Sequence, residues 1–142
     1  MSISGVSVEE ETIKIFEEMR FRQQAGGLIL NIKEGKIEIE REVDGDFNGM
    51  VGSLPDAEPR FILYDVPMSN RAGIDVVKTV FIFWLPMESP VRMRMEYASS
   101  KAIITKEFRG IATQLQEDDK SELTIDYTIA KVNKTQGINR AP

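Results

Sequence analysis

Residues 76–85 constrain the fold of this chain more strongly than any other segment. The segment is rich in apolar and β-branched residues and is continuously apolar from Val80 to Leu85. A strand with one face in water alternates between apolar and polar residues, whereas an unbroken apolar run is typical of a strand covered on both faces. The segment therefore predicts a central strand, buried on both sides of a sheet.

Three segments carry the apolar spacing of helices. Ser7 and Glu10 have the spacing of a capping box at the start of the first, and Ser89 is expected to be the N-cap of the second, before Pro90. Ser99 and Ser100 are expected to bend the second helix, because their hydroxyls can bond to the preceding turn. The expected helices are residues 8–22, 90–109 and 125 to about 134.

Apolar or alternating segments between turn residues predict further strands. They are residues 28–32, 36–43, 61–66 and 111–116, the last as an edge strand, while residues 44–59 are expected to be a loop with at most a short helix. This order of elements predicts an α/β fold with a mixed sheet between helices. The length of 142 residues suits a single domain over residues 1–142, with a core at about 4–135 and a polar tail at 136–142.

The charge and composition limit the partners. The chain has 23 acidic against 18 basic residues, a formal net charge of -5, whereas capture of nucleic acid or anionic membrane requires a basic face. No apolar run reaches the roughly 18 residues of a membrane-spanning helix, and the N-terminus lacks the pattern of a secretion signal. The absence of Cys permits a reducing compartment. We therefore expect a cytoplasmic protein that binds no nucleic acid and is not an integral membrane protein.

The residue types also disfavour catalysis. With neither His nor Cys, the commonest general base, thiol nucleophile and zinc ligands are missing. Motifs for a nucleophilic serine, a phosphate-binding loop or a dinucleotide are absent as well. We expect no catalytic residues, no metal and no cofactor.

Residues 44–49 have the pattern that starts a calcium-binding loop. Asp44, Asp46 and Asn48 supply oxygen ligands at alternate positions, and Gly49 follows in the sixth. The twelfth position should be a bidentate Glu and is Pro55. A calcium-binding signalling domain therefore stays as an alternative of a different class, with an acidic turn as the simpler interpretation.

Two arginines begin the expected long helix. Arg92 and Arg94 lie where the helix dipole disfavours cations by about 0.3 to 1 kcal/mol each, so the fold does not require them there. Met93 and Met95 alternate with them, and Met beside Arg is typical of protein-contact surfaces. Solvated arginines beside buried methionines remain an equal alternative on this pattern alone.

The same region resembles the strand-to-helix segment of the actin-depolymerising factor/cofilin family. The resemblance continues over nearly the whole chain, from the N-terminus to the region after the long helix, and is most specific from Met95 to Lys101. It is carried by Phe81-Ile82-Phe83-Trp84, Pro86, the run from Pro90 to Lys101, Ser4-Gly5-Val6, Leu63-Tyr64-Asp65 and the segment from Phe108 to Leu115. It implies a single-domain, cofilin-like fold (the ADF-homology fold), in which the long helix inserts into a cleft of actin.

The resemblance also implies two sets of actin-binding residues. Those expected to contact monomeric actin are Ser4, Gly5, Val6, Arg92, Arg94 and Met95, and Ser4 is in addition a candidate for regulatory phosphorylation. Those expected to contact the filament are Lys78, Lys106, Lys131 and Lys134. Val76, Thr105 and Ala130 depart from charges common in the family, which predicts weaker filament binding.

We therefore expect a monomeric, cytoskeletal protein that binds actin monomers and filaments and promotes depolymerisation and severing, with phosphoinositides as weak ligands. The nearest alternative is a regulator of the branch-forming actin complex on the same fold, as glia maturation factor is.

Overall fold

The computed structural model describes residues 5–139. Six strands form one mixed sheet in the order β1-β3-β2-β4-β5-β6. The outer pairs β1–β3 and β5–β6 are parallel, and the inner pairs are antiparallel. The strands are β1 (Ser7–Val8), β2 (Gly26–Lys33), β3 (Lys36–Val43), β4 (Arg60–Ser69), β5 (Asp75–Trp84) and β6 (Ile111–Glu117).

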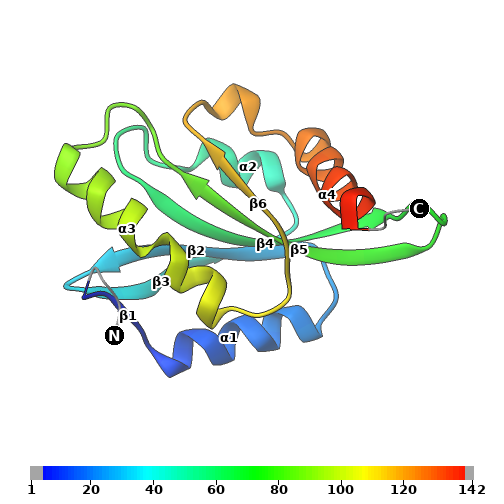
Figure 1. The fold of residues 1–142 in the computed structure, drawn as a ribbon, viewed down its shortest axis with the longest axis horizontal. Coiled ribbons are helices and arrows are strands. Elements are labelled where there is room, and N and C mark those ends of the chain that lie inside the picture. Colours follow the sequence, from blue (N-terminus) through cyan, green and yellow to red (C-terminus); the bar gives the residue numbers. More distant parts are fainter. Residues whose placement is uncertain (1–4, 140–142) are drawn as a thin grey trace.

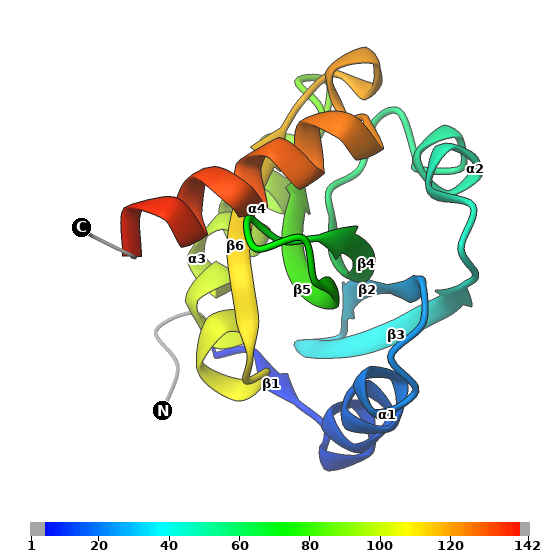
Figure 2. The same cartoon turned by 90° about the vertical axis from the view of Figure 1, so that its right-hand side faces the viewer.

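Helices cover both faces of this sheet, α1 and α3 on one face and α2 and α4 on the other (Figure 1; Figure 2). The helices are α1 (Glu10–Phe21), α2 (Phe47–Gly52), α3 (Val91–Glu107) and α4 (Ile125–Asn139), with a 3-10 turn, η1, at Lys120–Glu122. The predicted α/β fold with a mixed sheet between helices is confirmed.

Strand β5 explains why the sheet needs two covering layers. Phe81 and Phe83 face the core beneath α1 and α3, whereas Ile82 and Trp84 face the core beneath α2 and α4. All four side chains are at most 2% exposed. The continuous apolar run therefore serves two cores at once, as its pattern predicted.

The start of the first helix was predicted wrongly. Ser7 is not a helix cap, because it belongs to β1 and its N–H donates to the Gly35 carbonyl at 3.1 Å. The helix begins at Glu10 after Glu9, whose side chain makes no cap hydrogen bond. A long-range strand pairing, which the local spacing could not reveal, has replaced the capping box.

Several other boundaries differ from the prediction. Strand β2 begins at Gly26 instead of 28, β4 continues to Ser69 instead of 66, and α3 ends at Glu107 instead of 109. Ser89 does not cap α3, because its hydroxyl donates to the Pro86 carbonyl at 2.7 Å and the helix begins only at Val91. Helix α4 continues past Lys134 to Asn139, so residues 136–139 of the expected tail are helical. Within the described part of the chain, no helix is both long and apolar enough to cross a membrane.

Candidate functional site

The N-terminal half of α3 combines an anchored face with an exposed apolar face. Tyr97, Ser100 and Ile104 recur at helical spacing and are at most 1% exposed against the sheet. On the other side, Val91 is 70% and Met95 67% exposed. Apolar side chains that are neighbours on a helix and face water mark a surface for a partner more often than scattered ones do.

The middle of α3 is fixed to the sheet by a directed hydrogen bond. The backbone N–H of Ile32 on β2 donates to the Tyr97 hydroxyl at 2.8 Å, and the Tyr97 ring packs on Phe61 with centroids 5.1 Å apart. Burial raises the pKa of Tyr97, so the hydroxyl stays neutral. The hydroxyls of Ser99 and Ser100 both donate to the Glu96 carbonyl, the type of bond from which the bend was predicted, and the bend itself stays a prediction. Tyr97 thus fixes the helix to the sheet just after its first turns.

Arg92 and Arg94 occupy these first turns. No acidic residue offsets them in the first turn, and no ion pair between described residues includes either one. Arg92 is exposed, whereas Arg94 is half-buried and its Nη1 donates to the Pro86 carbonyl at 2.8 Å. Arg92 is therefore the cation most available to a partner, and Arg94 also has a structural contact.

The N-terminal segment lies beside this helix. Strand β1 neighbours α3, so the chain that follows Gly5 and Val6 approaches the same face of the molecule. Gly5 is exposed with a φ of 74°, a backbone conformation that favours glycine, whereas Val6 is only 4% exposed and belongs to the core. Ser4 lies outside the described residues.

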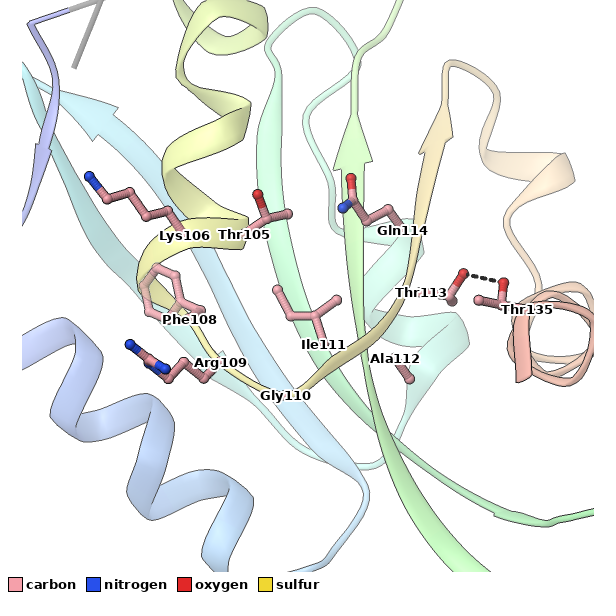
Figure 3. A pocket seen from close by; sticks show the side chains of 10 residues that line it. All are labelled: Thr105, Lys106, Phe108, Arg109, Gly110, Ile111, Ala112, Thr113, Gln114 and Thr135. Atoms are coloured by element: carbon pink, nitrogen blue, oxygen red, sulfur yellow. Dashed lines mark hydrogen bonds between the residues drawn. The ribbon is translucent and has the colours of Figure 1, made fainter. Parts of the chain in front are cut away.

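The lysines expected to contact the filament are distributed over three elements. Lys78 is half-buried on β5, Lys106 is exposed in the last turn of α3, and Lys131 and Lys134 lie on α4. A hollow of about 780 Å³ separates the end of α3 from α4 along β6, lined by Lys106 on one side and Thr135 on the other (Figure 3). Lys78 lies next to Thr79, whose strand partner is Ile111 in that hollow.

The hollow also contains residues that the sequence did not single out. Arg109 is exposed at its rim, and Figure 3 shows its side chain next to that of Phe108, on the side of the hollow away from α4. On the opposite side, the hydroxyls of Thr113 and Thr135 are 2.8 Å apart and connect β6 to α4. Arg109 was expected as the last residue of the long helix, whereas the structure ends α3 at Glu107 and places Arg109 beyond it.

The acidic loop before α2 is occupied by its own backbone contacts. Asp46 caps α2 by accepting from the Gly49 N–H at 2.9 Å, and Asp44 accepts from the Asp46 N–H at 3.1 Å. Among the described residues, no group of three or more acidic side chains is placed to hold a metal ion. The two carboxylates thus stabilise a turn and a helix start, which is the simpler of the two interpretations.

Fold and exposed helix together are those of an actin-depolymerising factor homology domain. The family model described as "Cofilin/tropomyosin-type actin-binding protein" matches residues 5–133. The chain therefore belongs to the actin-depolymerising factor/cofilin family, whose members are actin-binding proteins and not enzymes.

Named relatives agree with this assignment over nearly the full chain. Cofilin of Schizosaccharomyces pombe is 31% identical over 137 residues, which cover 94% of this chain and 99% of that protein. Cofilin of Yarrowia lipolytica is 32% identical over 141 residues, covering 96% and 92%. The crystal structure of Streptomyces griseoflavus cofilin superposes with a TM-score of 0.81 at 25% identity, covering 91% and 98%.

The fold alone does not separate this family from its structural neighbours. The solution structure of glia maturation factor from Caenorhabditis elegans has a TM-score of 0.78 at 20% identity, which shows a shared fold only. The sequence relatives named cofilin favour actin binding over this alternative and over calcium binding.

Proposed function

We propose that this chain binds actin monomers through the exposed start of α3 and the adjoining N-terminal segment, and that it promotes filament depolymerisation and severing. The contact residues are Gly5, Arg92, Arg94 and Met95, with Val6 supporting the segment from the core and Ser4 preceding it. The chain acts as a single-domain monomer in the cytoplasm.

One observation carries this proposal. Arg92 is exposed near a helix N-terminus, without an acidic neighbour in the first turn and next to the exposed Val91. The helix dipole makes this position unfavourable for a cation, so folding does not account for it. An arginine beside apolar side chains is typical of the centre of a protein interface.

Filament remodelling then follows from preferential binding. A protein that binds one twist or subunit state of the filament more tightly than another shifts the population toward that state, and subunits leave or the filament breaks there. The energy comes from differential affinity, and this chain needs no catalytic group for it.

Arg92→Ala tests the monomer contact. We expect affinity for labelled monomeric actin to fall by about tenfold to a hundredfold, because an interface arginine can contribute 2 kcal/mol or more. Arg109→Ala is the matched control, since Arg109 is an exposed arginine beyond the other end of α3 and should leave monomer affinity unchanged. Equal affinities for the parent and Arg92→Ala would remove α3 from the site.

A second surface is proposed for the filament. Lys106 lines the hollow along β6, Lys131 and Lys134 lie on α4, whose Thr135 lines its other side, and Lys78 lies on β5. Local cations of this kind also suit weak binding of phosphoinositides. Co-sedimentation with filaments beside a debranching assay separates actin binding from regulation of the branch-forming complex. Debranching without filament or monomer binding would favour the glia maturation factor alternative.

A phosphate on Ser4 would add up to two negative charges next to the proposed contact. We therefore expect Ser4→Glu to lower monomer affinity without changing the circular dichroism spectrum. A substituted chain that sediments with actin as well as the parent would count against this switch.

A further inference from the structure

Met87 is an exposed apolar residue that the two expected sets of contact residues do not include. It is 75% exposed and lies in the turn between β5 and α3, outside the helix itself. We propose that Met87 is a further contact residue of the actin-binding surface, and that Arg94 positions it by holding the turn that carries it. This inference rests on the function proposed for α3.

The turn is closed by bonds to one acceptor. The carbonyl of Pro86 accepts from the Ser89 N–H at 3.1 Å and from the Ser89 hydroxyl at 2.7 Å. The Arg94 Nη1 reaches the same oxygen at 2.8 Å from the second turn of α3. Pro86 and Ser89 are buried, whereas Met87 and Glu88 between them are exposed. The turn is therefore anchored at both ends and presents only its tip.

Arg94 connects this tip to the apolar face of α3. Val91 and Arg94 are three residues apart and therefore neighbours on the helix surface, and Met95 adjoins Arg94 in the chain. Because the Arg94 head group is bonded to the residue before Met87, the turn is held next to the side of α3 that carries Val91. Met87, Val91 and Met95 are 75%, 70% and 67% exposed, so the anchored turn adds a third exposed apolar side chain at the start of the helix.

The chemistry of this surface defines what it contacts on actin. Methionine is unbranched and adapts its shape to an irregular apolar pocket, while the neighbouring Arg92 requires an acidic or carbonyl oxygen at the pocket's rim. Other strongly exposed apolar residues lie on separate elements, Phe21 at the end of α1 and Ile74 in the turn between β4 and β5. Single residues of that kind are ordinary on a protein surface, whereas three at the start of one helix and the turn that leads into it are not.

The contact can be observed through methionine methyl groups. The chain has seven methionines, so ¹³C-methyl labelling gives a sparse spectrum in which Met19 and Met50, at 5% and 3% exposure, serve as internal controls. Binding to monomeric actin broadens every methyl signal because the complex is larger, and the buried pair measures this general effect. We expect the Met87 and Met95 methyl signals to shift or broaden more than those of the buried pair. A Met87 signal that changes no more than that of Met19 would overturn the inference.

Affinity measurements separate contact from positioning. We expect Met87→Ala to weaken monomer binding by about fivefold to tenfold, the loss for an apolar side chain that is partly desolvated. Phe21→Ala, at an even more exposed apolar residue on another element, is the control and should leave the affinity unchanged.

A double-mutant cycle tests the role of Arg94. If Arg94 holds the Met87 turn, the losses from Arg94→Ala and Met87→Ala should be less than additive, whereas Arg92→Ala and Met87→Ala should add. Arg94→Ala should also change the Met87 methyl signal in the free protein. Full additivity with Arg94, together with an unchanged Met87 signal, would overturn the positioning role.

The outcomes also distinguish this inference from the proposed function. Loss of binding in Arg92→Ala with unchanged binding in Met87→Ala would overturn the Met87 contact and leave the function in place. A parent protein that binds neither monomers nor filaments would overturn both.

Discussion

Asp65 is a buried carboxylate that no proposed contact uses. It is 1% exposed on β4, and its Oδ1 accepts from the Thr79 hydroxyl at 2.5 Å. Its Oδ2 has no hydrogen-bond partner among the described residues. Burial raises the pKa of Asp65 above its ordinary value, and the Thr79 hydrogen bond and the charge of Arg20 lower it by less. The folded protein therefore disfavours the ionised form.

This carboxylate predicts a change of stability with pH. A raised pKa means that the folded state binds more protons than the unfolded chain, so the contribution of Asp65 to the free energy of unfolding is lost as pH rises through the folded pKa. The Asn side chain of the Asp65→Asn variant does not ionise, so the variant does not lose this contribution. The free energy of unfolding of the variant, relative to that of the parent, should therefore increase from about pH 4 to pH 7. Denaturant unfolding at several pH values measures this, with the exposed Asp118→Asn as control. A difference that is the same at every pH would contradict the assignment.

The two arginines of α3 should differ in stability as well as in binding. Arg94→Ala removes the bond to the Pro86 carbonyl and should lower the free energy of unfolding by about 1 kcal/mol, the typical value for one hydrogen bond. Arg92→Ala removes an exposed cation from a helix N-terminus and should change the free energy of unfolding by less than about 0.5 kcal/mol. Thermal melts of both variants compare them directly. A larger loss in Arg92→Ala would show that it has a structural contact as well.

At the scale of elements, the type of most elements was easier to predict from sequence than their bounds, and the short strand β1 was not predicted. β3 has its predicted bounds. β5 lies within one residue of its predicted bounds at each end, because its own apolar run is enough to indicate a buried strand. The starts of α1 and α3 depend on a partner distant in the chain or on the turn before the helix. Ser7 pairs with β3 and Ser89 bonds to Pro86, and neither partner can be inferred from a capping pattern.

The candidate site shows the same division. The arginines at 92 and 94 stand out in the sequence because they oppose the helix dipole. The exposure of Met87 and the hydrogen bond from Arg94 to the preceding turn depend on the three-dimensional course of the backbone. The spacing of apolar residues in the sequence does not predict that course. The sequence therefore indicated the start of the proposed surface, and its proposed extension to Met87 rests on the structure.

The filament surface gives a prediction at this scale. Val76 on β5 and Thr105 on α3 take positions where the resemblance to the family implies a cation in some relatives, so filament binding should be modest and salt-sensitive. Val76→Arg with Thr105→Arg should raise filament affinity about tenfold, measured by co-sedimentation at two salt concentrations. Ala57→Arg with Gln24→Arg adds the same charge at exposed positions elsewhere and should give a smaller gain. An equal gain in filament affinity for both double variants would show that net charge, and not the positions 76 and 105, accounts for the effect.

For the whole molecule, the absence of histidine predicts a muted response to pH. Histidine is the side chain whose ordinary pKa lies near neutrality, and this chain has none. Any change in filament disassembly between about pH 6.5 and 8 should then come mostly from actin. Co-sedimentation and disassembly rates at both pH values should change by the same ratio for the parent and for Asp65→Asn. A strong pH response that disappears in Asp65→Asn would place the sensor in this chain.

The central claim is that the start of α3 and the turn before it form the contact with monomeric actin. Hydrogen–deuterium exchange of this chain, alone and with saturating monomeric actin, tests the claim along the whole backbone at once. We predict that protection concentrates in the turn from Pro86 and the first turns of α3, with a smaller effect in the adjoining segment around Gly5. The α2 helix, on the opposite face of the sheet, should exchange at the same rate with and without actin. Protection confined to α2 and α4, with unchanged exchange at Met87 to Met95, would contradict the account.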